Sequence, residues 1–301
     1  MIESCLVNGH CTDVIRSVAS LICIDELQIS VFWGRCSSFE HMSKPHTPSD
    51  GPFRLDIALA AVDYLLIKLP RLTCLVRSVL EQPFDTKAHS TATSTAEILY
   101  NSNEDLYIQS TLRKHTRIVK CLEGTSRSPT GETFDFDGLN AFVLDTRYYL
   151  YRTLLCGLIQ ALDNFAPNSA FCNNSTAEQE DLSAATSISM CVDYAFEPTR
   201  ALPLKALGVV IPIQLGLGAW HRLQHRQSST DAEYQRALLM KRWSLDRIQY
   251  LAEMWHVKPV EPKRMELVCE MFAGGPLIQD AYVPKQYESA LDNISTETHC
   301  K

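Results

Sequence analysis

The sequence is poor in glycine, and it lacks the loops that bind phosphate groups. Only 12 of its 301 residues are glycine, and neither a G-x-G-x-x-G loop nor a P-loop occurs. Such loops need glycine because backbone amides must approach the anion closely. A G-x-S-x-G nucleophile elbow is also missing. The sequence therefore contains no complete catalytic signature, and Gly216-Leu217-Gly218, inside an apolar stretch, predicts close helix packing instead.

Metal-binding and disulfide patterns are missing as well. The 11 cysteines include no pair at two-residue spacing, which argues against a zinc site. Their odd number in a long chain argues against a small secreted disulfide scaffold. We expect reduced cysteines, mostly buried as small apolar side chains. His221 and His225 share a helix face, but Arg222 and Arg226 beside them would repel a metal cation. No metal ligand and no cofactor is predicted.

Long hydrophobic runs are lacking. The longest uncharged stretch, Ala206–Gly218 and on to Trp220, is too short to span a bilayer and contains Pro212. The apolar stretch Val18–Ile24 is too short for a signal peptide. We therefore expect a nuclear and/or cytoplasmic protein without membrane contact. The net charge of −7 argues against a surface that binds nucleic acid as a whole.

The sequence does contain strong helical periodicity and a normal globular balance, with 46% hydrophobic and 21% charged residues. The clearest helix is Leu139–Leu162, which is apolar on several sides and is expected in the middle of a bundle. No strand pattern of comparable strength appears. We predict an all-α fold, an irregular multi-helix bundle of antiparallel helical hairpins. It forms one domain over residues 1–286, with loops near 30–50, 124–138 and 163–181 and a flexible tail at 287–301.

Three capping boxes predict helix starts, at Ser94, Ser175 and Thr230, because each is followed by glutamate three residues later. A helix over Glu97–Leu122, with a bend at Asn101-Ser102-Asn103, is expected to follow the first box. Pro70 predicts a break or kink, and Pro262 suits the first turn of a short helix.

Two groups of side chains are candidates for binding. A basic run, with apolar residues between its cations, lies near the end of the helix predicted over Glu97–Leu122. Two interpretations of this run are open: a surface that binds phosphate or an acidic partner, or a solvated helix face. The run comprises Arg113, Lys114, Arg117 and Lys120. Large aromatic side chains are core residues or line a pocket inside the bundle; they are Tyr148, Tyr149, Tyr151, Trp220, Trp243 and Trp255. The acid pairs Glu104-Asp105 and Glu180-Asp181 suit loops or helix starts.

Three segments carry a resemblance to a known family. They are the run Asp145–Arg152, the stretch from Ala201 to Leu215 ahead of Trp220, and the closing helix Trp243–Trp255. Over about Leu55–Leu277 the chain resembles the central and C-terminal regulatory region of fungal binuclear zinc-cluster transcription factors.

The resemblance does not extend to the DNA-binding head of that family, in which six cysteines bind two zinc ions. Cys5 and Cys11 share one of its spacings, but no C-x-x-C pairs surround them. No zinc ligand can be carried over, and no direct sequence-specific DNA contact is expected.

Two functions stay open at this point. The resemblance implies a transcription-regulatory domain that acts through protein partners, a homodimer or a small effector, in connection with a secondary-metabolite gene cluster. The alternative is an enzyme of fungal secondary metabolism with a pocket inside the helical bundle. A pocket with convergent groups of shifted pKa would favour the enzyme, and a filled core with an exposed apolar groove would favour the regulator.

Overall fold

The computed structural model describes residues 13–48, 53–121, 128–164, 174–196, 203–226, 230–258 and 260–278. The all-α prediction is confirmed, since helices dominate these residues and the one sheet that they form has two strands. The predicted tail 287–301 lies outside the described residues. No helix among them combines the length and apolar character that crossing a bilayer requires.

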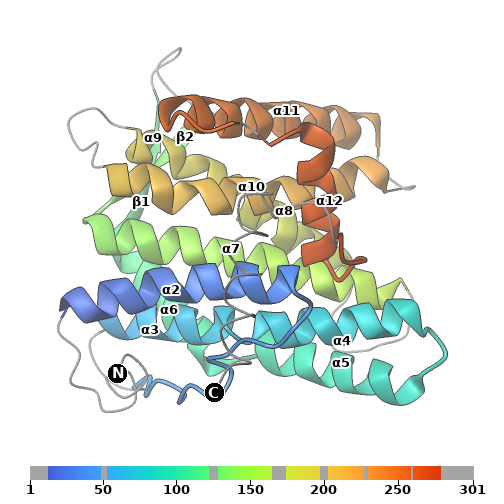
Figure 1. Cartoon of the computed structure of the whole chain (residues 1–301). Helices are drawn as coiled ribbons and strands as arrows, with labels where there is room; N and C mark the ends of the chain where they lie inside the picture. The colour runs from blue at the N-terminus through green and yellow to red at the C-terminus, as the bar shows by residue number, and fades with distance from the viewer. Residues whose placement is uncertain are drawn as a thin grey trace, which may run out of the picture.

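The N-terminal half supplies the lower group of helices in Figure 1. A first apolar core forms where these helices pack together and against the helix that follows. Their bounds are α2 Asp13–Phe32, α3 Leu55–Leu66, α4 Leu69–Glu81, α5 Thr86–Tyr100 and α6 Asn103–His115.

The C-terminal half supplies the upper group in Figure 1 and encloses a second apolar core. Its bounds are α8 Asn174–Met190, α9 Val192–Ala195, α10 Pro203–His225, α11 Asp231–Met254 and α12 Pro262–Phe272. Since α8 begins at Asn174, the loop predicted over 163–181 is too long. The same start lies one residue before the predicted cap at Ser175.

The helix α7, Leu139–Asp163, runs between the two groups (Figure 1). Its residues contribute to both apolar cores, with Leu150 and Leu158 in the first and Phe142 in the second. A helix that is apolar on several sides must be buried on several sides. The central position predicted for Leu139–Leu162 is therefore confirmed.

Several predicted boundaries are also confirmed. The helix is interrupted between α3 and α4. Pro70 lies in the first turn of α4, where a missing N–H costs no helical hydrogen bond. Pro262 is likewise in the first turn of α12. Thr230 and Glu233 form the predicted capping box of α11, with each side chain bonded to the backbone of the other residue.

The helix start predicted at Ser94 is wrong. Ser94 lies inside α5, which begins at Thr86 and is capped by Asp85. The Asp85 carboxylate accepts hydrogen bonds from the backbone N–H groups of Lys87 and Ala88, both at 3.0 Å. The serine- and threonine-rich start of this helix has modest helix propensity, but burial of Ala92 and Ala96 outweighs it.

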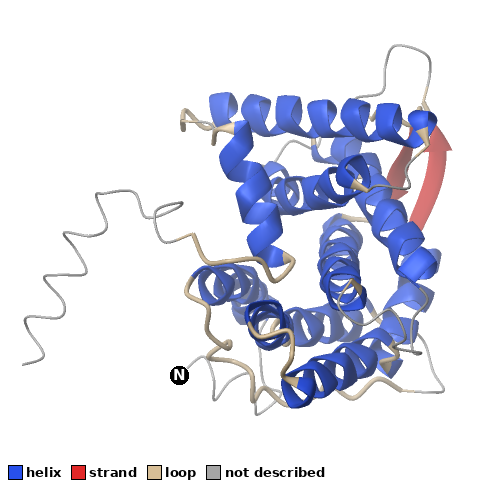
Figure 2. Ribbon diagram, turned by 90° about the vertical axis from the view of Figure 1, so that its right-hand side faces the viewer, coloured by secondary structure: helices blue, strands red, loops and turns tan. Residues whose placement is uncertain are grey.

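The long helix predicted over Glu97–Leu122 is also wrong, because the segment forms three elements. Ser102 caps a new helix, α6, and the chain then enters a strand, β1 Thr116–Lys120. This strand pairs antiparallel with β2, Glu132–Phe136, which lies inside the predicted loop 124–138. The β-branched residues of β1 and the buried Phe134 and Phe136 of β2 favour the hairpin, which lies at one edge of the molecule in Figure 2.

A partly buried ion pair links α7, α8 and α10, and two glycines leave room for it. Arg222 of α10 donates to Asp181 of α8 at 2.8 to 2.9 Å, and Asp181 also accepts from Thr153 of α7 at 2.5 Å. A Cβ on Gly157 would lie 2.9 Å from the Arg222 guanidinium carbon, and one on Gly218 would lie 3.1 Å from Nη1 of the same side chain. The close packing predicted for Gly216-Leu217-Gly218 is therefore observed.

Gly157→Ala is expected to destabilise the protein by about 1–3 kcal/mol. Alanine has the higher helix propensity, but its methyl group would displace the Arg222 guanidinium from Asp181. Urea unfolding of the variant tests this. Gly208→Ala is the matched control, because its Cβ would meet only the edge of the Phe142 ring, at 3.3 and 4.0 Å, and would disturb no ion pair, so we expect a smaller loss. Equal losses in the two variants would contradict the steric account.

Candidate functional site

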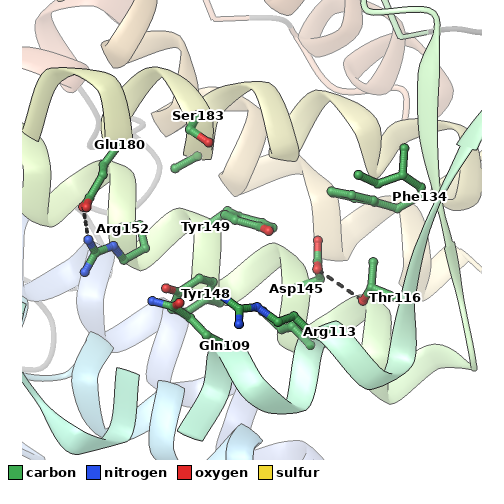
Figure 3. Close-up of a pocket in the computed structure, with 13 residues that line it drawn as sticks. Gln109, Arg113, Thr116, Phe134, Asp145, Tyr148, Tyr149, Arg152, Glu180 and Ser183 are labelled. Atoms are coloured by element: carbon green, nitrogen blue, oxygen red, sulfur yellow. Dashed lines mark hydrogen bonds and ion pairs between the residues drawn. The ribbon is translucent and has the colours of Figure 1, made fainter. Parts of the chain in front are cut away.

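A cavity of about 370 Å³ lies where α6, the β-hairpin, α7 and α8 meet (Figure 3). This volume is within the range of small-molecule pockets, toward its lower end. Its polar lining is Gln109, Arg113, Thr116, Asp145, Tyr148, Tyr149, Arg152, Glu180 and Ser183, and its apolar lining is Leu112, Ile118, Phe134 and Ala184.

Helical spacing explains why these side chains converge. On α7, Asp145 is followed by lining residues three, four and seven positions later, namely Tyr148, Tyr149 and Arg152. Residues at these spacings project from one helix face. The other two helices repeat the pattern, with Gln109, Leu112 and Arg113 on α6 and Glu180, Ser183 and Ala184 on α8.

Asp145 is the most deeply buried acid of the cavity, with 1% of its surface exposed. Its carboxyl group accepts hydrogen bonds from Thr116 Oγ1 at 3.4 Å and from the Cys191 thiol at 3.3 Å. Burial raises the pKa of Asp145 to about 7, and these two hydrogen bonds offset only part of the rise. Asp145 can therefore both give and take a proton near neutral pH.

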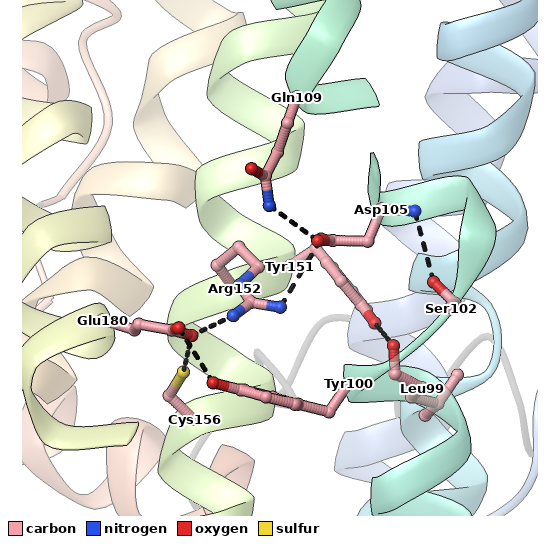
Figure 4. A network of polar contacts seen from close by, with 9 residues as sticks. All are labelled: Leu99, Tyr100, Ser102, Asp105, Gln109, Tyr151, Arg152, Cys156 and Glu180. Carbon is pink, nitrogen blue, oxygen red and sulfur yellow. Dashed lines mark hydrogen bonds and ion pairs between the residues drawn. The ribbon is translucent and has the colours of Figure 1, made fainter. Parts of the chain in front are cut away.

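Arg152 connects the cavity to a polar network (Figure 4). Its guanidinium pairs with Asp105 of α6 at 3.4 Å and with Glu180 of α8. Glu180 also accepts from the Tyr100 hydroxyl at 2.8 Å, and Asp105 accepts from Gln109 at 2.7 Å. Burial raises the pKa of Asp105, and the Arg152 charge partly opposes this rise. The network fixes one wall of the cavity and compensates the Arg152 charge.

The sequence placed the acid pairs at loops or helix starts, and this is correct only for Glu104-Asp105, in the first turn of α6. Glu180 and Asp181 lie inside α8, where Glu180 lines the cavity and Asp181 is buried against Arg222. A clustered pair of acids suits a helix N-terminus electrostatically, so the pattern alone gave no reason to expect an interior position.

The structure does not bring the predicted pocket aromatics together. Tyr148 and Tyr149 line the cavity, and burial raises the pKa of both phenols. Tyr151 lies on another face of α7 and donates to the Leu99 carbonyl at 2.8 Å. The other three are distant from the lining: Trp220 is fully buried among α8, α10 and α11, Trp243 packs half-buried against the second core, and Trp255 follows α11.

The basic run does not form one helix face, contrary to expectation. Arg113 and Lys114 end α6, whereas Arg117 and Lys120 belong to β1. Arg113 lines the cavity, Lys114 lies 4.2 Å from the centre of the Phe53 ring, and Arg117 pairs with Asp137 at 3.0 Å. Lys120 is exposed on the strand.

The histidine pair His221 and His225 makes polar contacts with neighbouring protein groups. Nε2 of His221 lies 3.1 Å from a Glu270 oxygen, and the Lys241 ammonium group lies 3.4 Å from Nδ1. Nδ1 of His225 is 2.9 Å from the His221 carbonyl oxygen. Across the described ranges, no group of three or more His, Cys, Asp or Glu side chains is arranged to hold a metal ion.

A second hollow, of about 600 Å³, lies between α11 and the segment that enters α12. It is larger and its lining is also rich in charged side chains, but its two acids, Asp246 and Glu261, are exposed, and its half-buried Lys241 is paired with Glu266 at 2.6 Å. The first cavity combines a buried acid, two tyrosines and two arginines, which is the arrangement expected of a specific ligand site. We therefore take the first cavity as the candidate functional site.

Comparison with protein-family models, curated proteins and solved structures finds no match to this chain. Membership of the zinc-cluster transcription factor family therefore stays a prediction from the sequence, and the function rests on the cavity.

Proposed function

We propose that this chain is a helical regulatory domain that responds to a small effector bound in the cavity between α6, α7, α8 and the hairpin. The observation that carries the proposal is the convergence of Arg113, Asp145, Tyr149 and Arg152 on one cavity. Convergent polar groups of this kind orient a ligand, while the apolar lining supplies contact area. The resemblance to fungal zinc-cluster regulators supports a role in transcription, reached through protein partners or a homodimer.

The position of the cavity suits a response to a ligand. Its lining comes from four elements, α6, the hairpin, α7 and α8. A ligand that contacts several of them favours whichever arrangement of these elements it binds better. The change would be transmitted through the Arg152 network, which already links α6, α7 and α8.

Ser183→Trp is expected to abolish ligand binding without unfolding the protein. Ser183 is exposed and lines the cavity from α8, so an indole there would occupy the cavity instead of entering the core. The measurement is a thermal-shift screen of a small-molecule library on both proteins. Compounds that raise Tm of the wild type are expected to leave Tm of the variant unchanged.

Ser78→Trp is the matched control, because Ser78 is exposed on α4 and is not part of the cavity lining. It is expected to keep the wild-type response. If the active compounds stabilise Ser183→Trp as strongly as Ser78→Trp, they bind elsewhere and the proposal is wrong.

A second function, acid–base catalysis by an enzyme, is favoured by the feature expected of an enzyme, a pocket with convergent groups of shifted pKa. Asp145 is buried beside Tyr149, and its pKa of about 7 suits general acid or base chemistry near neutral pH. Transcript and metabolite profiling after deletion of the gene separates the two functions. A regulator changes transcript levels, whereas unchanged transcripts with one accumulating intermediate would support the enzyme and overturn the regulatory proposal.

A further inference from the structure

The cavity lining includes a cation, Arg113, without an ion-pair partner among the residues that the structure describes. Arg113 lines the cavity and is exposed, and within the described part of the chain it makes no hydrogen bond and no ion pair. Its neighbours in the basic run differ, since Lys114 lies over the Phe53 ring and Arg117 pairs with Asp137. In Figure 3 the Arg113 side chain extends toward Tyr148 and Gln109. Its planar fork of N–H donors is therefore available to a ligand.

The other charged groups of the lining are already engaged. Arg152 lies between Asp105 and Glu180, and Glu180 also accepts from Tyr100. Asp145 accepts from Thr116 and Cys191, and its raised pKa keeps a proton on much of the population at neutral pH. A ligand therefore meets an unpaired positive charge at Arg113, and the negative charge near it lies at Asp145 and in the Arg152 network, where two carboxylates face one guanidinium.

The apolar part of the lining suits a flat ring. The Phe134 and Tyr149 rings are nearly parallel, with an interplanar angle of 9° and centroids 6.3 Å apart. Leu112 and Ala184 add aliphatic surface, and Ile118 lies at the exposed side. Aromatic side chains favour contact with other rings through offset or edge-on packing.

We propose that the cavity selects small aromatic carboxylates, with the carboxylate paired to the Arg113 guanidinium and the ring against Phe134 and Tyr149. This inference rests on the proposed function, because it names the class of ligand that the same cavity binds. A bidentate guanidinium–carboxylate pair is among the stronger charge-assisted contacts, and its geometry excludes neutral and cationic groups of the same shape.

The test uses three probes of nearly one shape and different charge: benzoate, benzamide and benzamidinium. Affinities are measured by NMR titration of the wild type, of Arg113→Met and of Arg242→Met. Arg242 is the matched control, since it is an exposed arginine of α11 that lines the second hollow. We expect benzoate to bind the wild type and Arg242→Met at least about tenfold more tightly than benzamide, with benzamidinium weakest. Arg113→Met is expected to lose this preference.

The outcomes separate the ligand class from the function. If benzamide or benzamidinium binds as tightly as benzoate, and Ser183→Trp prevents it, the carboxylate inference is wrong while the cavity remains the binding site. If benzoate binding is lost in Arg242→Met but not in Arg113→Met, or if none of the three probes binds, the inference is also wrong. A library screen without any compound sensitive to Ser183→Trp would overturn the proposed function itself.

Discussion

Asp181→Ala is expected to lower the free energy of unfolding by about 3–5 kcal/mol, because it leaves the partly buried Arg222 charge without its partner. The side chain of Asp181 is 2% exposed and that of Arg222 is 22% exposed. Asp181 accepts from Arg222, from Thr153 at 2.5 Å and from Gln160 at 3.0 Å. One substitution therefore removes the shared acceptor of α7 and α10. Urea unfolding followed by circular dichroism measures the loss.

Two further variants give this prediction its control. Asp137→Ala also breaks an arginine pair, with Arg117, but this pair is exposed and no measurable change is expected. The double variant Asp181→Ala, Arg222→Met removes the stranded charge, so it should be more stable than Asp181→Ala alone. A loss below about 1 kcal/mol in the single variant would show that water or other groups solvate Arg222 adequately.

Asp145→Asn is expected to become more stable relative to the wild type as the pH rises, by an amount on the order of 4 kcal/mol. The folded-state pKa of Asp145, about 7, lies above its ordinary value of 3.8, so the folded chain retains this proton to a higher pH than the unfolded chain does. Its contribution to stability is complete below about pH 4 and is lost as the pH rises through about 7. Asparagine does not titrate, so the variant does not lose this stability as the pH rises.

The measurement is the free energy of unfolding of both proteins across this pH range, taken as the difference between them. The difference cancels the groups whose pKa is lowered in the folded protein, such as Glu26 and Glu40, which act in the opposite sense. A difference that stays constant with pH would mean that Asp145 ionises as easily as an exposed aspartate. The acid–base function would then lose its support.

The sequence predicted the helical fold because its strongest signals are local. The apolar residues of Leu139–Leu162 repeat on several faces, which requires a central helix, and Thr230 with Glu233 forms a complete capping box. Pro70 and Pro262 lie in the first turn of a helix, where a missing N–H costs no helical hydrogen bond. Both therefore mark helix starts that the structure contains.

The hairpin and the cavity could not be predicted with the same ease, because both depend on contacts distant in the sequence. Thr116–Lys120 follows a helix without a break, and its strand forms only because Glu132–Phe136 pairs with it. The sequence does predict that one helix face carries Asp145, Tyr148, Tyr149 and Arg152, because of their spacing. Which face of a buried helix borders a cavity depends on the packing of α6 and α8, and that information is not local.

The most direct test of the central claim is methyl NMR of the protein, labelled at leucine, isoleucine and alanine, during a fragment screen. Binding fragments are expected to move the signals of Leu112, Ile118 and Ala184, which line the first cavity. The signals of Leu238, Leu245 and Ile248 in the second hollow should remain in place. The claim that the first cavity is the ligand site would be contradicted by fragments that move only the signals of the second hollow. A library that leaves the signals of the first cavity in place would also contradict it.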